Sequence, residues 1–254
     1  MSALRPPFLK DLVWREPPAD RAVYPFNLPW LADDGFRIAF EAPVTVFAGE
    51  NGSGKSTLLE AIADHLGLGR GGGSRDHRDV SGEMAGGLAK SLRFSWLPKV
   101  TNGFFFRAET YFELVRYLEE TAKEWPAMRL NYGGKPLDAQ SHGEAFLALF
   151  ENRLGNDRKA IYLFDEPEAA LSPQRLARFV RLLRRAELSG NVQVIMATHS
   201  PVLMGYPGAQ LLDLSGGEIR ERRLTDTEHF RTLQDFFVDP DLYYERVFEE
   251  DEED

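Results

Sequence analysis

The chain has 254 residues, 43% of them apolar, which is enough for one sizeable core in a single α/β domain or in two small lobes. It contains no cysteine, which excludes disulfides and thiolate metal sites and is compatible with the cytoplasm. The net charge of −10 disfavours general affinity for nucleic acid, but the six acidic residues 249–254 carry most of it, and the remaining −4 leaves the kind of partner open.

The sequence also bears on membrane attachment. Residues 1–7 lack the basic-then-apolar order of a signal peptide. No apolar run approaches the roughly 20 residues that span a bilayer, and the longest core-like run, 192–198, has the length of a strand. We therefore expect a soluble, cytoplasmic protein without direct membrane insertion.

The first half of the chain predicts strands that alternate with helices. Residues 1–35 are rich in proline and aromatic residues and predict an irregular arm laid on a core. Alternating or β-branched apolar residues predict strands at 36–40, 44–47, 92–97 and 104–107. Helices are predicted at 56–65, about 110–124 and 143–153, and the eight glycines in 67–87 indicate a mobile loop.

The second half continues the alternation. We predict a strand at 160–164, a helix at 173–188 with Ser172 as its N-cap, and a strand at 192–197. A hairpin at 211–224, turned at 215–218, precedes two closing helices near 228–238 and 241–248. This order predicts a mainly parallel sheet.

A glycine-rich loop, Gly49-Glu-Asn-Gly-Ser-Gly-Lys-Ser-Thr57, fits the pattern G-x-x-x-x-G-K-[ST] between an apolar strand and an apolar helix. Glycines let backbone N–H groups surround phosphates, the Lys55 ammonium reaches the β- and γ-phosphates, and the Ser56 hydroxyl ligates Mg²⁺. The following helix points its positive end at the anion. The predicted nucleotide-binding residues are Asn51, Gly52, Ser53, Gly54, Lys55, Ser56 and Thr57.

The apolar strand at 160–164 runs into two acids, Asp165 and Glu166. The carboxyl end of a buried parallel strand can place Asp165 beside the Mg²⁺. Glu166 can orient and deprotonate the attacking water. A strand running into an acidic turn would explain the pair if it stood alone, but the presence of Lys55 favours a metal and catalytic site.

Another buried strand ends in Thr198-His199-Ser200. A histidine at a strand end commonly satisfies only a structural hydrogen bond. Here the apolar strand and the flanking hydroxyl residues favour a functional role for His199.

These motifs resemble those of ABC-type ATPases, in particular the compact soluble group of AAA-family or ABC-like ATPases akin to repair and chromosome-maintenance ATPases. The segment 164–172 looks like the Walker B motif and D-loop of that family, and His199 resembles its switch histidine, which contacts the γ-phosphate and the attacking water. In residues 140–144, Ser141 lies 24 residues before Asp165 (141 to 165), where the family has its Leu-Ser-Gly-Gly-Gln signature. The resemblance implies that Ser141, Gly143 and Glu144 also contact ATP, although Ser-x-x-Glu is equally a helix capping box.

The signature-like segment keeps Ser141 and Gly143 but has His142 and Glu144 at the other two positions, and the sequence departs from the family pattern in two further places. Ser172 stands where the family usually has aspartate, and its role as an N-cap before Pro173 explains it equally well. No glutamine occurs in residues 1–139, where the family places one after a strand. Glu109 is either a substitute that faces the metal or water, or an ordinary residue at a helix start.

The resemblance covers about residues 36–215 and implies an α/β P-loop NTPase fold. Its mainly parallel sheet is flanked by helices, with an antiparallel β part and a small helical subdomain of the ABC ATPase type at about 109–158. We predict one ATPase domain over 1–246 and an acidic, disordered tail at 247–254. The aromatic residue that stacks on adenine is unassigned, and core packing is predicted for Tyr24, Phe26 and Trp30.

In the family, the glycine-rich loop, called the P-loop, and the signature of one chain face different nucleotides. The resemblance therefore implies an ATP-dependent, head-to-tail homodimer that buries two ATP molecules between Lys55 of one copy and Ser141 of the other. Hydrolysis by Glu166, with Lys55 and His199, loosens this dimer. Our first prediction is a soluble, Mg²⁺-dependent ATPase in nucleic-acid repair or maintenance, or in defence. The alternatives are the ATP-binding subunit of a membrane ABC transporter and a scaffold that binds ATP without hydrolysing it.

Four arginines recur at three- and four-residue spacing on the helix predicted at 173–188, namely Arg175, Arg178, Arg181 and Arg185. Such a stripe is usually a solvated helix face, and binding of nucleic acid is the alternative.

Overall fold

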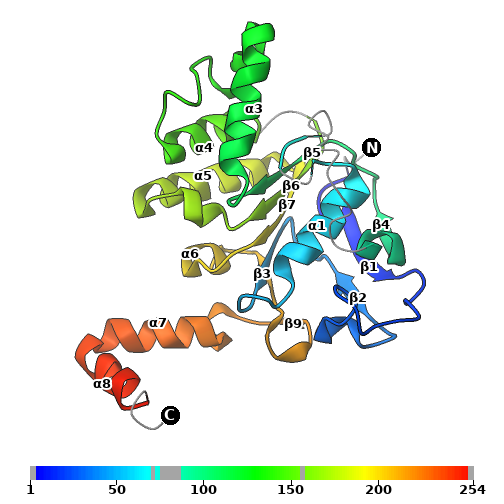
Figure 1. Ribbon diagram of the computed structural model, residues 1–254, viewed down its shortest axis with the longest axis vertical. Helices are drawn as coiled ribbons and strands as arrows, with labels where there is room; N and C mark the ends of the chain where they lie inside the picture. Colours follow the sequence, from blue (N-terminus) through cyan, green and yellow to red (C-terminus); the bar gives the residue numbers. More distant parts are fainter. Residues whose placement is uncertain (1–3, 70–71, 75–86, 155–157, 251–254) are drawn as a thin grey trace.

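The computed structural model describes residues 4–69, 72–74, 87–154 and 158–250. Its centre is a six-stranded sheet in the order β5-β6-β7-β3-β8-β9, with helices on both faces (Figure 1). Neighbouring strands run parallel from β5 to β8, and β9 pairs antiparallel with β8. The strands are β3 (Val44–Ala48), β5 (Gly103–Arg107), β6 (Ala160–Asp165), β7 (Val192–Ala197), β8 (Gln210–Asp213) and β9 (Arg220–Glu221). The predicted mainly parallel α/β fold is confirmed.

A second, antiparallel sheet has the order β2-β1-β4. Its strands are β1 (Leu9–Trp14), β2 (Arg37–Ala39) and β4 (Leu92–Trp96). The prediction of an irregular arm over residues 1–35 was therefore wrong for β1. This strand forms because it pairs on both edges with segments that are distant in the sequence, and no local periodicity reveals such partners.

The longer helices follow the sequence-based predictions to within a few residues, whereas the four-residue helices Leu88–Ser91 and Pro201–Met204 were not predicted. They are α1 (Lys55–Leu66), α2 (Leu88–Ser91), α3 (Tyr111–Glu124), α4 (His142–Glu151), α5 (Pro173–Ser189), α6 (Pro201–Met204), α7 (Glu228–Val238) and α8 (Pro240–Glu250). Short 3₁₀ turns lie at Pro29–Leu31, Pro126–Tyr132 (η3), Pro167–Ala170 (η4), Ser215–Gly217 and Leu224–Asp226. The predicted hairpin at 211–224 is present as β8 and β9.

Two predictions of disorder have different outcomes. The tail predicted over 247–254 was wrong for residues 247–250, which continue α8 for one more turn. Residues 251–254 lie outside the described residues, as do 70–71 and 75–86 of the predicted mobile loop.

The core divides into two clusters, one on each face of the central sheet. Adjacent strand residues point to opposite faces, so Phe104 and Phe106 join one cluster and Phe105 joins the other. The first cluster packs under α3, α4 and α5, and the second lies between the sheet, α1 and the antiparallel sheet. Each fully buried phenylalanine contributes about 1.5–3 kcal/mol through the area it removes from water. This burial fixes the carboxyl ends of β3, β6 and β7 relative to one another.

A buried glutamine ties the amino-terminal strand to the centre of the molecule. The Oε1 atom of Gln193, on β7, accepts hydrogen bonds from the backbone N–H groups of Phe8 and Leu9, each at 2.8 Å. Its Nε2 atom donates to the Leu9 carbonyl at 3.2 Å. Because Gln193 is fully buried, these bonds satisfy an amide that would otherwise be costly to bury.

Among the described residues, none of the helices combines the length and apolar character required to cross a lipid bilayer.

Candidate functional site

The glycine-rich loop connects β3 to α1, and its lysine is held inside it. Lys55 is 5% exposed, and its Nζ atom donates to the backbone carbonyls of Gly49 at 2.6 Å and Glu50 at 2.9 Å. Burial lowers the pKa of Lys55, while the nearby Glu166 and Asp165 carboxylates act in the opposite direction. The ammonium group is therefore positioned at the mouth of a loop whose backbone N–H groups can receive phosphate.

The last glycine of the loop is required by its surroundings. Gly54 has a φ of 93°, and a Cβ atom placed there would lie 2.9 Å from side-chain atoms of both Leu28 and Trp30. Trp30 also donates from Nε1 to the Ser53 carbonyl at 2.7 Å. The amino-terminal segment thus packs closely against the loop and supports its shape.

The acid pair after β6 lies next to this loop, as predicted. The Ser56 hydroxyl donates to Asp165 Oδ1 at 2.9 Å, although the two residues are far apart in the sequence. Burial raises the pKa of Asp165 to about 6, and the Ser56 hydrogen bond and Arg107 offset only part of that effect. A carboxylate and a hydroxyl oxygen at this separation are suitable donors for Mg²⁺, a cation that prefers oxygen ligands.

The raised pKa of Asp165 predicts that its charge destabilises the fold when no cation is bound. Between the ordinary pKa of 3.8 and about 6, the folded chain holds a proton that the unfolded chain has lost, so stability falls as the pH rises through this interval. At pH 7 the cost is about 3 kcal/mol. We expect Asp165→Asn to raise the melting temperature by several degrees without Mg²⁺ or nucleotide, measured by calorimetry. Asp138→Asn, at an exposed position, should leave it unchanged, and a lower melting temperature for Asp165→Asn would contradict this cause.

An arginine not singled out from the sequence also reaches Asp165 of this acid pair. Arg107 stands at the end of β5, and its Nη1 atom lies 2.8 Å from Glu60 Oε1. Its Nη2 atom lies 3.2 Å from Glu109 Oε2, and its Nε atom lies 3.6 Å from Asp165 Oδ2. Arg107 is buried, whereas the Glu109 side chain is 79% exposed. The end of β5 beside Asp165 therefore holds a cation. The only sequence signal for Arg107 is a charged residue at the end of a run of three phenylalanines, and the end of a strand explains that pattern equally well.

Glu166 and His199 come together at the ends of β6 and β7. The His199 Nε2 atom lies 3.7 Å from Glu166 Oε1, which is too long for a hydrogen bond. Glu166 has a φ of 51°, and it is the only non-glycine residue with a positive φ that the structure describes. Burial, and then the charge of Lys55, lower the pKa of His199, so this ring is neutral at pH 7. Strained backbone at a carboxylate beside a neutral imidazole is typical of a functional site.

A second glutamate positions the loop that carries His199. Glu168, in η4, accepts through Oε1 from the backbone N–H groups of His199 at 2.7 Å and Ser200 at 3.1 Å. Its role was missed because these bonds are made to backbone groups, which the sequence does not reveal.

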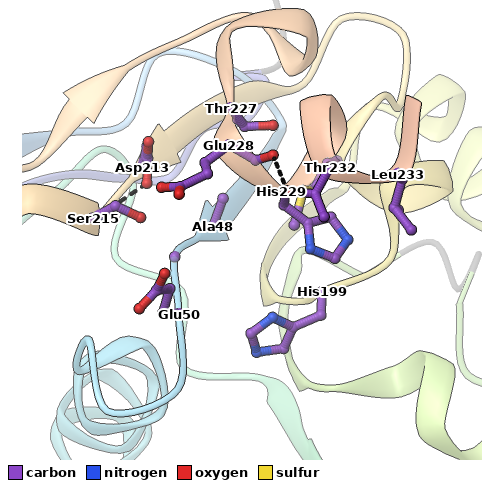
Figure 2. Close-up of a pocket in the computed structure, with 12 residues that line it drawn as sticks. Ala48, Glu50, His199, Asp213, Ser215, Thr227, Glu228, His229, Thr232 and Leu233 are labelled. Carbon is purple, nitrogen blue, oxygen red and sulfur yellow. Dashed lines mark hydrogen bonds between the residues drawn. The ribbon is translucent and has the colours of Figure 1, made fainter. Parts of the chain in front are cut away.

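A cavity of about 280 Å³ lies beside His199, and α7 forms one of its walls (Figure 2). The rings of His199 and His229 have centroids 6.3 Å apart, and Glu50 of the P-loop lies across the cavity. Thr227 caps α7, because its Oγ1 atom accepts a hydrogen bond from the Phe230 backbone N–H at 3.3 Å. This cap fixes where the first turn of α7 begins beside the cavity. The sequence did not predict that α7 returns to this site, because no motif marks His229.

The signature-like residues lie elsewhere on the same chain. Ser141 precedes α4, and Glu144 Oε2 accepts from its backbone N–H at 3.0 Å and from its hydroxyl at 2.6 Å. These bonds lower the pKa of Glu144. Gly143 packs so closely that a Cβ atom would lie 2.4 Å from Arg175 Cδ. Among the described residues, no hydrogen bond or ion pair joins this turn to the P-loop.

The upstream aromatic residues have different environments. Trp30 is buried in the core, and Phe26 packs against the same cluster. Tyr24 is 58% exposed and its hydroxyl hydrogen-bonds to Thr57 Oγ1, so the prediction of core packing was wrong for this residue. It projects from a proline-flanked turn beside the P-loop, which a count of aromatic residues does not distinguish from burial.

The parallel sheet, the glycine-rich loop with its buried lysine and the neighbouring acid pair define a P-loop nucleotide-binding protein. Residues 27–115 match a family model described as an AAA domain, and residues 145–205 match one described as "AAA domain, putative AbiEii toxin, Type IV TA system". Each match covers less than half of the chain, and both agree with a P-loop fold of the AAA type.

Two solved structures are similar to the chain. A putative metal-chelate type ABC transporter in an inward-facing conformation has 16% identity and a TM-score of 0.45, with 76% of each chain covered. CbiO1 from Clostridium perfringens, part of the ABC transporter complex CbiONQ, has 16% identity and a TM-score of 0.47, covering 94% of this chain and 99% of its own. No curated protein sequence matches the chain.

Proposed function

We propose that this chain hydrolyses ATP with Mg²⁺, and that hydrolysis takes place between two copies arranged head to tail. The observation that supports hydrolysis most directly is the 2.9 Å bond from Ser56 Oγ to Asp165 Oδ1, since it joins the phosphate loop to the acid pair. Glu166 and His199 lie at the same sheet edge. An activated-water reaction needs these groups together.

Ser56 and Asp165 would hold the Mg²⁺, which supplies charge neutralisation to the triphosphate when it is bound. Lys55 and the backbone N–H groups of residues 51–57 bind the phosphates. The exposed ring of Tyr24, bonded to Thr57, is our candidate for stacking on adenine.

Glu166 would accept a proton from the attacking water through its carboxylate, which is half-exposed at the sheet edge. The neutral His199 ring would hold that water and the γ-phosphate in place through Nε2, a buried atom that makes no hydrogen bond among the described residues. Glu168 keeps His199 in position through the two backbone bonds.

The head-to-tail arrangement rests on the separation of Ser141 from the P-loop within one chain. A helix amino terminus such as that of α4 suits the γ-phosphate of a partner's nucleotide. In this arrangement Ser141, Gly143 and Glu144 complete the site of the other copy.

A mixing experiment tests this arrangement. Lys55→Ala removes the phosphate lysine and Ser141→Arg blocks the α4 turn, so neither variant alone should release phosphate from ATP. An equal mixture forms heterodimers with one intact site, and we expect it to recover up to roughly a quarter of the wild-type rate. If the mixture stays inactive while the wild-type chain hydrolyses ATP, the head-to-tail proposal fails but the ATPase proposal stands.

For the biological role we propose a soluble cytoplasmic ATPase in nucleic-acid maintenance or in defence. The wording of the second family model, which refers to a putative toxin of a Type IV system, favours defence. Phosphate release measured with and without DNA, RNA and membranes would distinguish these roles. Co-purification with a multi-spanning membrane protein would favour a transporter subunit instead.

A further inference from the structure

The C-terminal hairpin, formed by α7 and α8 over residues 228–250, extends away from the body of the molecule (Figure 1). Helix α7 has no buried residue, and even its large apolar side chains Phe237 and Val238 are 74% and 78% exposed. On α8, Phe248 is 63% exposed and its ring stacks on Tyr244 with centroids 5.9 Å apart. Adjacent exposed apolar side chains of this size mark a binding surface.

The hairpin is also strongly acidic, with seven acidic residues and two arginines between Glu228 and Glu250. Three of the acids recur every fourth residue on α8, at Asp241, Glu245 and Glu249, and all three are exposed. Residues four apart lie on one helix face, and this acidic row is about 12 Å long. Phe248 lies on the same face. The surface therefore suits a partner that carries both positive charge and apolar groups.

Helix α5 presents a surface of the opposite kind. Arg178, Arg181 and Arg185 form an exposed row about 10 Å long, close to the length of the acidic row. The row borders a cavity of about 460 Å³ that Arg184 and Glu151 also line. Because every lining residue is charged, the apolar part of this wall consists of side-chain stems.

Part of this arginine row has no acidic partner within the chain. Arg178 pairs with Glu151 at 2.9 Å, and Arg184, beside the row, pairs with Glu187 at 2.7 Å. No ion pair to Arg181 or Arg185 occurs within the part of the chain that the structure describes. Two positive charges are therefore available to a partner.

We propose that the acidic row of α8 in one copy of the chain docks on the arginine row of α5 in a second copy. The two rows match in length and oppose in charge, and the Phe248 ring can pack on arginine stems and guanidinium groups. Within one chain the hairpin and α5 are apart (Figure 1), and no ion pair joins them among the described residues. Each copy carries both rows, so two copies can exchange both contacts around a two-fold axis. The contact uses no residue of the proposed ATP site and forms without nucleotide.

Sedimentation velocity of the full chain without nucleotide tests this proposal. We expect the wild-type chain to associate at low salt and to dissociate at high salt. Arg181→Glu/Arg185→Glu and Glu245→Arg/Glu249→Arg should each weaken association at least about tenfold, because like charges then face each other. The chain with all four substitutions restores opposite charges and should recover most of the wild-type affinity. Arg93→Glu/Arg116→Glu, an equal charge change at exposed positions elsewhere, is the matched control.

Three outcomes would overturn the proposal. The wild-type chain could stay monomeric at low salt, or the chain with all four substitutions could fail to recover association. The third outcome is that the charge reversal on α8 weakens association while the charge reversal on α5 does not. If the α5 reversal instead abolishes DNA-stimulated hydrolysis and leaves association intact, the arginine row binds nucleic acid. Repeating the measurement with Lys55→Ala separates this contact from the ATP-dependent dimer, since the contact should survive that substitution.

Discussion

Glu166→Gln is expected to reduce the rate of ATP hydrolysis by about 10²- to 10⁴-fold, the range for losing a general base. Glutamine has the shape of glutamate and can occupy the same backbone position at φ 51°, but it cannot accept the proton of the attacking water. Nucleotide binding should persist because Lys55, Ser56 and Asp165 are unchanged. The bound triphosphate then holds two copies together, so the variant should sediment as a stable dimer with ATP and Mg²⁺.

Glu120→Gln, at an exposed position on α3, is the matched control and should hydrolyse ATP at the wild-type rate. The two variants separate hydrolysis from assembly. A Glu166→Gln chain that remains monomeric at saturating ATP and Mg²⁺ would contradict the ATP-dependent dimer, and one that retains full activity would exclude Glu166 as the base.

Lys55→Ala is expected to weaken binding of ATP with Mg²⁺ roughly 100-fold, which corresponds to about 3 kcal/mol of lost charge-assisted hydrogen bonding. The Lys55 ammonium is almost completely buried and bonds to the carbonyls of Gly49 and Glu50. Alanine removes the charge that the phosphates require and also leaves these carbonyls without their donor. Binding can be measured by titration calorimetry or with a fluorescent ATP analogue.

Lys123→Ala, near the end of α3, is the control for loss of one lysine. Its affinity should equal that of the wild-type chain. Wild-type affinity in Lys55→Ala would show that nucleotide does not occupy the glycine-rich loop, and the proposed function would then fail at its first step.

The sequence was sufficient to predict the elements whose signals are local. The P-loop, β6 with its acid pair and β7 with His199 were predictable because a turn or an apolar strand determines where each side chain stands. The proximity of Ser56 and Asp165 was predictable as well, because the glycine-rich loop and β6 meet at one edge of a parallel sheet.

The features that were missed depend on contacts between distant segments. Strand β1 forms only by pairing with β2 and β4, and Arg107 reaches Asp165 because β5 lies beside β6. His229 reaches the cavity because α7 returns to the site. Glu168 acts on backbone groups, so its identity alone does not reveal its partners. No periodicity or motif encodes such contacts.

The bonds between Gln193 and the backbone of Phe8 and Leu9 set a lower limit on how far the protein can be shortened. A fragment that starts at Phe36, where the recognisable ATPase motifs begin, would strip the middle strand from the small sheet. It would also leave the Gln193 carboxamide without these partners in the interior, on the strand that leads to His199. A fragment reduced to the motifs would therefore lose contacts that hold the motif-bearing strand in position. An affinity tag should be added before residue 4 and should not replace this amino-terminal segment.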